Sequence, residues 1–190
     1  MLMRKPAFWI FASFLFVAGL YYSAKVFPKA FAILNVELKM DRESAFSKAK
    51  SLSNTNNWGP ADYNQAATFY HDSQTQNFVE LDAGGSDKVV MLMKNHLYHF
   101  YTWKVRHYKE LEPNETIITF TPSGKFYGFK EILSETQKRA SLSQDNARII
   151  AENFIQMNTS IDLSNYKEIE ASEEVFPSER IDHTFVYERL

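Results

Sequence analysis

The order of apolar and polar positions divides the chain into one continuous apolar segment and a series of short amphipathic segments. Residues 6–24 contain no charged residue, and their length matches the ~20 apolar residues that an α-helix needs to cross a bilayer core. Large apolar side chains all round this segment leave no polar face to turn toward water. The pattern therefore predicts an uncleaved membrane anchor over residues 6–24, with lipid as its partner.

Two other interpretations of this segment stay open. A cleaved signal peptide needs small residues one and three positions before the cleavage site, and cleavage after Ala24 would place Tyr22 at the third position. The second alternative is the buried core helix of a soluble domain, which the missing polar face disfavours. An anchor agrees best with the length and the composition.

Positive charge predicts the orientation of the anchor. Arg4 and Lys5 directly precede the apolar segment, and positive residues favour the cytoplasmic side of a membrane. We therefore expect a cytoplasmic N-terminus and an extracytoplasmic location for the bulk of the chain. Pro28 is expected to bend or end the membrane helix near Phe27.

Apolar residues beyond the anchor recur at helical spacing in some places and alternate with polar residues in others. Asp41 is expected to cap a first helix, and Ser143 or Asp145 a later one. The expected helices are residues 42–51, 87–100 and 145–157, and the expected strands are residues 77–82, 101–110, 116–121, 126–129, 166–172 and 183–189. Residues 62–69 fit either a short helix or the start of a strand.

Two elements have faces that the pattern assigns. In the strand at residues 101–110, Trp103 and Val105 point to one side, and Lys104 and Arg106 point to the other, solvated side. The three strands between residues 101 and 129 predict an antiparallel meander. The buried face of the helix at residues 145–157 is expected to contain Ala147, Ile150, Ala151, Phe154 and Ile155.

The two halves of the chain resemble each other. Asp41 and Asp145 each open a helix, and NFVEL at residues 77–81 matches TFVYE at residues 184–188. The chain is therefore expected to be α+β: an N-terminal transmembrane helix followed by two related units of a helix and an antiparallel sheet. Chance similarity between short amphipathic elements is the alternative.

The expected boundaries follow from these elements. The anchor is residues 1–30, the first unit residues 31–133, the linker residues 134–143 and the second unit residues 144–190. The second unit lacks a counterpart of the meander and ends at or inside a strand. We therefore expect this unit to be incomplete and the chain to be the beginning of a longer protein.

Composition narrows the function classes. A net charge of −2 and a pI of about 6.2 give no basic surface, which argues against nucleic acid as a partner. The chain has no cysteine, so disulfides, thiolate catalysis and cysteine-based metal sites are excluded. The mean hydropathy of −0.36 indicates that the chain beyond the anchor is polar.

Three histidines form the only candidate metal cluster in the sequence. His96 and His99 are three residues apart on an expected helix, and His107 follows on a strand. Imidazoles with this spacing can bind zinc with a third ligand, but the HExxH pattern is absent. We expect ordinary, partly buried histidines, no metal site and no cofactor.

The strand at residues 101–110 also mixes aromatic and basic side chains. Trp103, Lys104, Arg106, His107 and Tyr108 are the residues concerned, and such a strand can bind an anion or stack on a base. The acidic overall charge favours the structural interpretation, in which Trp103 is a core residue.

Two further motifs receive no catalytic role. Asp182 and His183 with a nearby serine such as Ser178 could suggest a catalytic triad, but the nucleophile-elbow pattern G-x-S-x-G is absent. The sequence Asn114-Glu115-Thr116 matches a glycosylation acceptor of eukaryotic secreted proteins. No residue of this chain is assigned to catalysis.

Several stretches carry a resemblance to a known family. They are LNVELKMDRESAFSKA at residues 34–49, NWGPADY at 57–63, YTWKVRHY at 101–108, FTPSGKFYGF at 120–129 and PSERIDHTFVYER at 177–189. They resemble the N-terminal region that precedes the membrane core in some bacterial CPBP-type intramembrane metalloproteases, the family of CAAX proteases and bacteriocin-processing enzymes. The helix-plus-sheet units also look like PepSY-type domains, which is a weaker likeness.

The resemblance implies an accessory region rather than an active site. The family uses a Glu-Glu pair on one membrane helix and histidines on later ones, whereas Glu173-Glu174 of this chain lies in a polar segment. The implied function is a non-catalytic, single-pass extracytoplasmic module of the bacterial inner membrane that senses, binds or regulates, with a peptide or protein ligand. The alternatives are the N-terminal fragment of a polytopic protease whose catalytic helices lie beyond Leu190, and a stand-alone membrane-anchored binding protein.

Overall fold

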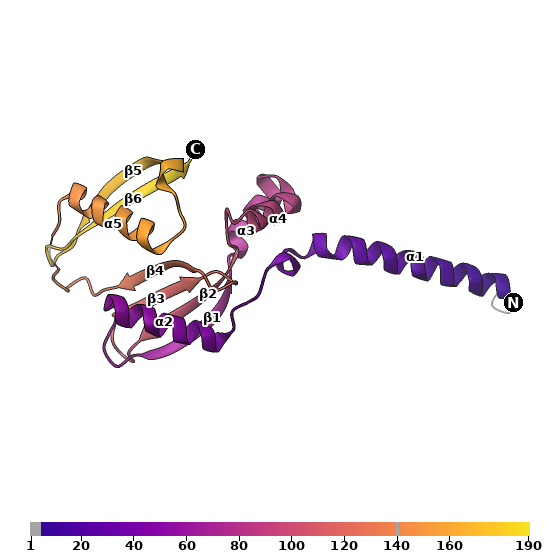
Figure 1. Ribbon diagram of the computed structural model, residues 1–190, viewed down its shortest axis with the longest axis horizontal. Coiled ribbons are helices and arrows are strands. Elements are labelled where there is room, and N and C mark those ends of the chain that lie inside the picture. The colour runs from indigo at the N-terminus through magenta and orange to yellow at the C-terminus, as the bar shows by residue number, and fades with distance from the viewer. Residues whose placement is uncertain (1–4, 140) are drawn as a thin grey trace. The chain divides into compact units, whose positions relative to one another are not determined.

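A computed structural model describes residues 5–139 and 141–190 (Figure 1). The fold is α+β, with one long apolar N-terminal helix, a four-stranded antiparallel sheet of order β1-β2-β3-β4 and a two-stranded sheet of β5 and β6. The backbone forms two compact units. The first comprises the chain up to Lys39 together with Phe69–Thr102, and the second comprises Met40–Thr68 together with Trp103–Leu190.

The N-terminal helix α1 (Pro6–Ala30) confirms the expected apolar helix. A proline at its start suits the first turn, where a missing N–H costs no hydrogen bond. Pro6–Phe27 is long and apolar enough to span a membrane, although a signal sequence near an N-terminus meets the same criterion. Its orientation stays a prediction.

Of the two outcomes expected at Pro28, a bend or an end of the helix near Phe27, the end is wrong and the bend stays a prediction. The helix continues past Pro28 to Ala30, and the Phe31 N–H donates to the Phe27 carbonyl at 3.2 Å. A proline removes only its own N–H from the helix, so later residues can still donate to the carbonyls four positions before them. A short 3₁₀ helix, η2 (Ala32–Asn35), follows.

The first compact unit also contains two adjacent helices, α3 (Ser73–Asp82) and α4 (Gly85–Lys94). The strand expected at residues 77–82 is therefore wrong. Asp72 caps α3, because its carboxylate accepts from the Thr75 N–H at 3.1 Å and from the Thr75 hydroxyl at 2.7 Å. A small core joins the two helices to the start of β2; its residues are Val79, Val89, Met93, Phe100 and Tyr101.

The helix expected at residues 87–100 is confirmed only in part. It begins at Gly85 and ends at Lys94, so His96 and His99 lie outside it. The backbone of His96 has a φ of 54°, a left-handed conformation that does not continue a right-handed helix.

The second unit begins with α2 (Arg42–Asn56), whose predicted cap is confirmed. The Asp41 carboxylate accepts from the Ser44 N–H at 2.8 Å, and Asn57 ends the helix in the left-handed conformation. The ambiguous segment at residues 62–69 is a strand, β1 (Asn64–His71).

The predicted meander is confirmed by β2 (Tyr101–Tyr108), β3 (Glu115–Phe120) and β4 (Phe126–Ile132), which pair in antiparallel order. Figure 1 shows α2 across one face of this sheet. The core between them contains Met40, Ala45, Ala49, Val105, Ile118 and Phe120. The face of β2 that was expected to be solvated is only partly exposed to solvent. Arg106 is exposed, but Thr102 is buried and Lys104 is half-buried.

The last part of the second unit consists of α5 (Gln144–Asn158), the 3₁₀ helix η3 (Leu163–Asn165), β5 (Tyr166–Val175) and β6 (Ile181–Arg189). We call the antiparallel pair of β5 and β6 the β5–β6 ribbon. Ser143, one of the two caps that the sequence left open, caps α5 through a 3.5 Å bond from the Asn146 N–H.

Two expectations about this region are wrong. No residue of α5 is fully buried: Ala147, Phe154 and Ile155 are half-buried, whereas Ile150 and Ala151 are exposed. The internal match between residues 77–81 and 184–188 pairs a helix, α3, with a strand, β6. Short amphipathic segments fit both periods when only five residues are compared.

Candidate functional site

Among the candidate site residues that the structure describes, His107 has the most deeply buried titratable side chain. Its Nδ1 lies 2.9 Å from the Ser53 hydroxyl, its Nε2 lies 2.8 Å from Gln65 Nε2, and the Tyr63 ring stacks on it at 3.9 Å. Gln65 Nε2 also donates to the Phe46 carbonyl at 3.3 Å. This amide nitrogen therefore donates to His107 Nε2, and the remaining imidazole proton lies on Nδ1 and is donated to Ser53. Burial lowers the pKa of His107 to about 4, so the ring is neutral at pH 7.

This network leaves His107 no ring nitrogen for a metal. His96 and His99 have ring centroids 5.8 Å apart, in the segment after α4. Within residues 5–139 and 141–190, no three histidine, aspartate or glutamate side chains gather in an arrangement that could bind a metal ion. The expected absence of metal and cofactor stays a prediction.

Aromatic and basic side chains of β2 contact other groups of the protein itself. The Trp103 Nε1–H donates to the Met40 carbonyl at 3.1 Å. Arg106 forms an ion pair with Glu115, and its guanidinium lies 4.7 Å from the centre of the Tyr108 ring. These contacts agree with a structural strand rather than a binding surface.

The residues considered for a triad do not act together. The Asp182 carboxylate accepts two hydrogen bonds from Arg180, at 2.9 and 3.2 Å. His183 Nε2 lies 2.9 Å from the Leu142 carbonyl, and Asp182 and His183 point to opposite faces of β6 because they are neighbours on a strand. The Ser178 hydroxyl is buried without a hydrogen-bond partner among the described residues. The Asp-His orientation that a triad needs is missing.

The glutamate pair and the glycosylation motif have structural positions. Glu173 lies on β5, 3.9 Å from His183 Nδ1, and Glu174 is exposed beside it. The Asn114 amide donates to Gln137 Oε1 at 3.0 Å, and its oxygen accepts from the Ser134 N–H at 2.9 Å. The Asn114 side chain thus ties the start of β3 to the segment after β4.

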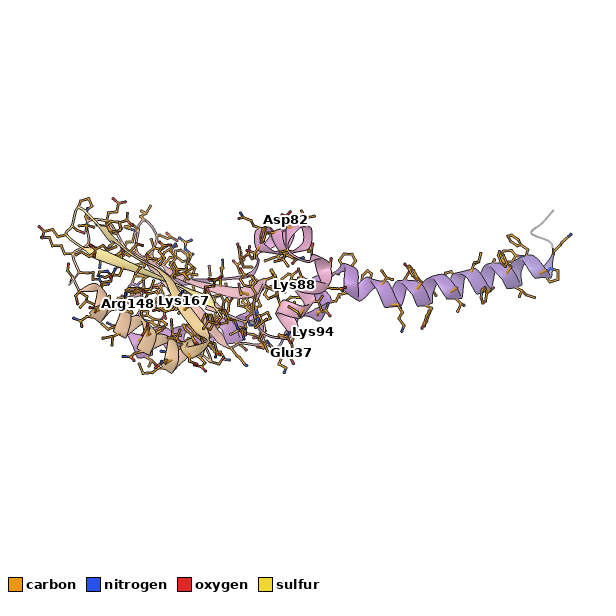
Figure 2. All side chains as sticks on the ribbon, turned by 90° about the horizontal axis from the view of Figure 1, so that it is seen from above. Glu37, Asp82, Lys88, Lys94, Arg148 and Lys167 are labelled. Carbon is orange, nitrogen blue, oxygen red and sulfur yellow. The ribbon has the colours of Figure 1, made fainter. Side chains whose placement is uncertain are left out.

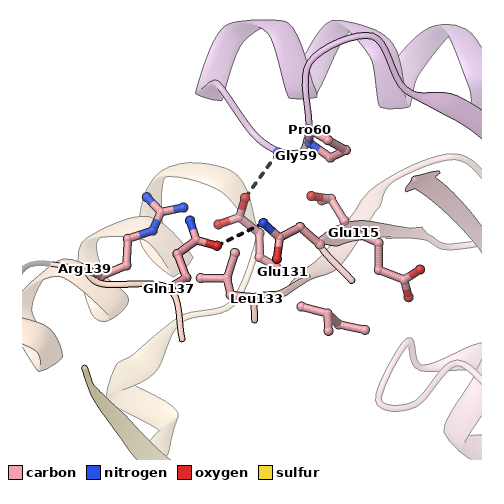
Figure 3. A pocket seen from close by; sticks show the side chains of 10 residues that line it. Gly59, Pro60, Glu115, Glu131, Leu133, Gln137 and Arg139 are labelled. Carbon is pink, nitrogen blue, oxygen red and sulfur yellow. Dashed lines mark hydrogen bonds between the residues drawn. The ribbon is translucent and has the colours of Figure 1, made fainter. Parts of the chain in front are cut away.

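A small cavity of about 100 Å³, lined by polar and apolar residues, lies beside this asparagine (Figure 3). The Gly59 N–H donates to the Glu131 carboxylate at 3.2 Å across it. The Thr116 hydroxyl is fully buried and has no hydrogen-bond partner among the described residues. The lining is completed by Pro60, Asn114, Glu115, Ile132, Leu133, Gln137 and Arg139.

The size of this cavity limits what it can hold. Sites for small-molecule ligands usually measure about 300–1,000 Å³, whereas this one has room for a few water molecules. The carboxylates of Glu115 and Glu131 already bond Arg106 and Gly59. We therefore interpret the cavity as a hydration site for Thr116 and not as a substrate pocket.

The β5–β6 ribbon and α5 expose an unpartnered surface of the second unit. The ribbon has only two strands, so each strand has one edge with no strand beside it in the described chain. Apolar side chains also remain in solvent here: Ile149, Ile150 and Met157 on α5, and Ile169, Val175 and Val186 on the ribbon.

Polar contacts hold α5 on the ribbon. Arg148 bonds Glu168 at 2.8 Å, and its guanidinium lies 4.9 Å from the centre of the Phe185 ring. The Tyr187 hydroxyl donates to the Glu152 carboxylate at 2.6 Å. Burial, together with this bond, raises the pKa of Tyr187, so the phenol keeps its proton and the contact at ordinary pH.

Sequence reasoning did not find the partners of His107 or the cavity. Ser53 and Gln65 precede His107 by 54 and 42 residues, and neither stands in a motif with it. No local spacing signals such contacts, because only the packing of α2 and β1 against β2 brings them together. The open edges of the ribbon had a signal in the sequence, which predicts only two strands after the helix at residues 145–157.

Comparison with known proteins adds no assignment. A scan against protein-family models, a search of curated proteins and a search of solved structures found no match to this chain.

Proposed function

We propose that this chain is a non-catalytic, membrane-anchored, extracytoplasmic binding module that regulates a membrane protease, and that it binds an extended peptide segment along the β5–β6 ribbon. An extended peptide can add a strand to an open sheet edge, gaining main-chain hydrogen bonds from unpaired N–H and C=O groups. The observation that carries the proposal is a two-stranded ribbon whose covering helix α5 has no fully buried residue.

The low burial of this region supports a missing partner. A two-stranded sheet is marginally stable in water, and three strands or a well-packed helix are needed for independent stability. Ile150 of α5 is 57% exposed and Val175 of β5 is 64% exposed, so apolar surface remains for a ligand to cover.

Charge favours the β6 edge over the β5 edge. β5 carries the carboxylates of Glu168, Glu170, Glu173 and Glu174, and charges on an edge strand discourage pairing. Residues 183–187 of β6, HTFVY, contain no acidic, lysine or arginine side chain. We therefore place the added strand beside β6.

One part of the predicted similarity between the two halves of the chain remains in the proposal. The order of helix and strand in α2–β1 recurs in α5–β5, and we propose that these are the corresponding elements of two related units. In this interpretation the peptide at β6 takes the place that further strands occupy in the four-stranded sheet.

The resemblance of residues 34–189 to the region ahead of CPBP-type membrane cores suggests the protease concerned. The alternative, an N-terminal part of a polytopic metalloprotease, differs by one observation. Sequencing of the gene past codon 190 distinguishes a frame that continues into several apolar spans from a separate anchored module.

Amide hydrogen exchange of the full chain in detergent micelles tests the binding mode. A synthetic peptide of alternating valine and threonine should protect amides of β6 and leave those of β5 unchanged. The same peptide with two adjacent prolines at its centre lacks a donor toward β6 in either register and should protect neither strand.

A matched pair of variants gives the control. Thr184 and Ser172 face each other across the ribbon, and both are exposed. Thr184→Lys should abolish the protection because a charge at the β6 edge opposes strand addition, whereas Ser172→Lys should preserve it. Protection confined to β5, or none on either strand, would overturn the proposal.

A further inference from the structure

The first compact unit exposes apolar side chains beside its membrane helix. α3 turns Val79 into the core and leaves Phe78 and Leu81 59% and 82% exposed. These two residues are three positions apart and therefore share one face of the helix. No charged residue occurs between Ser73 and Val79, and the charged residues of α3, Glu80 and Asp82, lie at its C-terminal end, where Asp82 follows Phe78 by four positions on the same face.

The chain directly after α1 has the same character. Phe31, Ile33, Leu34 and Leu38 are 43–59% exposed, and the first charged residue after Phe31 is Glu37. α4 contacts both η2 and α1 within this unit. A helix pair that contacts the end of a membrane-spanning helix lies close to the headgroup region.

We propose that the α3–α4 pair docks on the lipid surface of the membrane that α1 spans, with Phe78 and Leu81 inserted into the interface. This inference rests on the membrane anchoring in the proposed function and adds a second lipid contact. Amphipathic helices bind in this way with their apolar face ~5–10 Å into the boundary between headgroups and acyl chains.

The charged residues of this region fit a shallow position. Asp82, Lys88 and Lys94 are exposed on α3 and α4, and Glu37 lies in the segment before them (Figure 2). Charged side chains are tolerated at headgroup depth but are costly in the hydrocarbon core. The pair is therefore placed at the surface and does not span the bilayer.

The absence of cysteine makes a direct depth measurement possible. Single variants Phe78→Cys, Leu81→Cys, Gly19→Cys and Leu111→Cys are labelled with the fluorophore NBD in the full chain. Each is reconstituted in phosphatidylcholine vesicles containing a lipid with a nitroxide either near the headgroup or near the bilayer centre. Gly19 lies in α1 with no atom within 4 Å of an added Cβ, and Leu111 is a fully exposed residue between β2 and β3.

The inference predicts a specific order of quenching. Labels at Phe78 and Leu81 should lose at least about half of their fluorescence with the shallow nitroxide and less with the deep one, as expected for interfacial depth. The label at Gly19 should be quenched by the deep nitroxide, and the label at Leu111 by neither.

The controls separate the possible failures. Quenching at Gly19 without quenching at Phe78 and Leu81 would overturn the docking inference and leave the anchor intact. No quenching at Gly19 would overturn the anchor, and the inference with it. If the label in the Phe78→Cys variant is shielded from aqueous acrylamide but is not quenched by either nitroxide, protein covers this face, which also contradicts lipid docking. Circular dichroism of each labelled variant confirms that the helices are retained.

Discussion

At the scale of single residues, the neutral imidazole of His107 links protonation to folding. In the folded chain its pKa is about 4, below the ordinary value of 6.5, because the ring is buried between Ser53 and Gln65. Between these two values the unfolded chain takes up a proton that the folded chain excludes, so stability falls as pH is lowered.

The first prediction concerns this pH window. Lowering the pH from 6.5 to about 4 should reduce the free energy of unfolding through His107. The expected loss is roughly 1–3 kcal/mol after allowance for solvent screening. Urea unfolding of the full chain in micelles, followed by tryptophan fluorescence, measures the loss as a function of pH.

Two variants test whether His107 causes this pH dependence. His107→Gln should remove this part of the pH dependence, whereas His96→Gln, at an exposed position, should keep it. An unchanged pH profile in His107→Gln would contradict the linkage.

The second prediction concerns the close approach of Gly59 to Thr116. Gly59 has a φ of 83°, and an added Cβ would lie 2.9 Å from the Thr116 hydroxyl oxygen. Gly124 has a similar φ of 86°, but the Cβ there would meet the flexible end of Lys48. Gly59→Ala should therefore lower the free energy of unfolding by roughly 1–3 kcal/mol more than Gly124→Ala does. Equal effects in urea unfolding would show that Thr116 yields without cost.

At the scale of elements, strands were easier to predict than helix ends. The alternation in YTWKVRHY and the β-branched run TIITF identified β2 and β3, because one face of each is buried. α3 was missed because Phe78 and Val79 suggest a strand over a short window. The available signal was Asp72 three positions before Thr75, which is the arrangement of a helix cap.

The third prediction tests that cap. The Asp72 carboxylate accepts bonds from Thr75 and, at 2.6 Å, from the Tyr98 hydroxyl, so it ties the start of α3 to the segment after α4. Asp72→Ala should destabilise the α3–α4 pair by roughly 1–2 kcal/mol, seen as faster amide exchange in both helices. Asp87→Ala, which removes an exposed carboxylate from the first turn of α4, should have a smaller effect.

At the scale of the whole molecule, composition and periodic patterns over many residues predicted more of the fold than short motifs did. The apolar helix and the α+β class follow from hydrophobic content and period, which hold over many residues. The exposure of α5 could not be foreseen, because its periodic apolar positions look the same whether or not a partner covers them. The network of His107 depends on contacts between distant segments, which no local pattern encodes.

The fourth prediction concerns membrane association. The intact chain should remain with membranes after carbonate extraction, because Pro6–Phe27 is long and apolar enough to span a bilayer and residues 6–24 carry no charge. Deletion of residues 6–24 should release the protein into the soluble fraction. Full solubility of the intact chain would contradict the anchor.

The fifth prediction is that the purified chain cleaves neither casein nor a prenylated peptide and binds no stoichiometric zinc. A catalytic zinc needs three protein ligands and an open position for water. His107, one of the three candidate histidines, has both ring nitrogens in contact with Ser53 and Gln65. Elemental analysis and cleavage assays with added zinc provide the measurement. Stoichiometric zinc that disappears in the double variant His96→Ala and His99→Ala, together with cleavage, would contradict the prediction.

The position of α3 and α4 between β1 and β2 has a consequence for the order of folding. β2, β3 and β4 are joined by short turns, whereas β1 reaches its neighbour β2 only after both helices, where the Asp72 N–H meets the Phe100 carbonyl at 2.7 Å. Closing a long loop costs more chain entropy than closing a tight turn, so local pairings form first. The meander should therefore belong to the folding nucleus. β1 should join the sheet late, after α3 and α4 have formed and shortened the distance between the end of β1 and the start of β2.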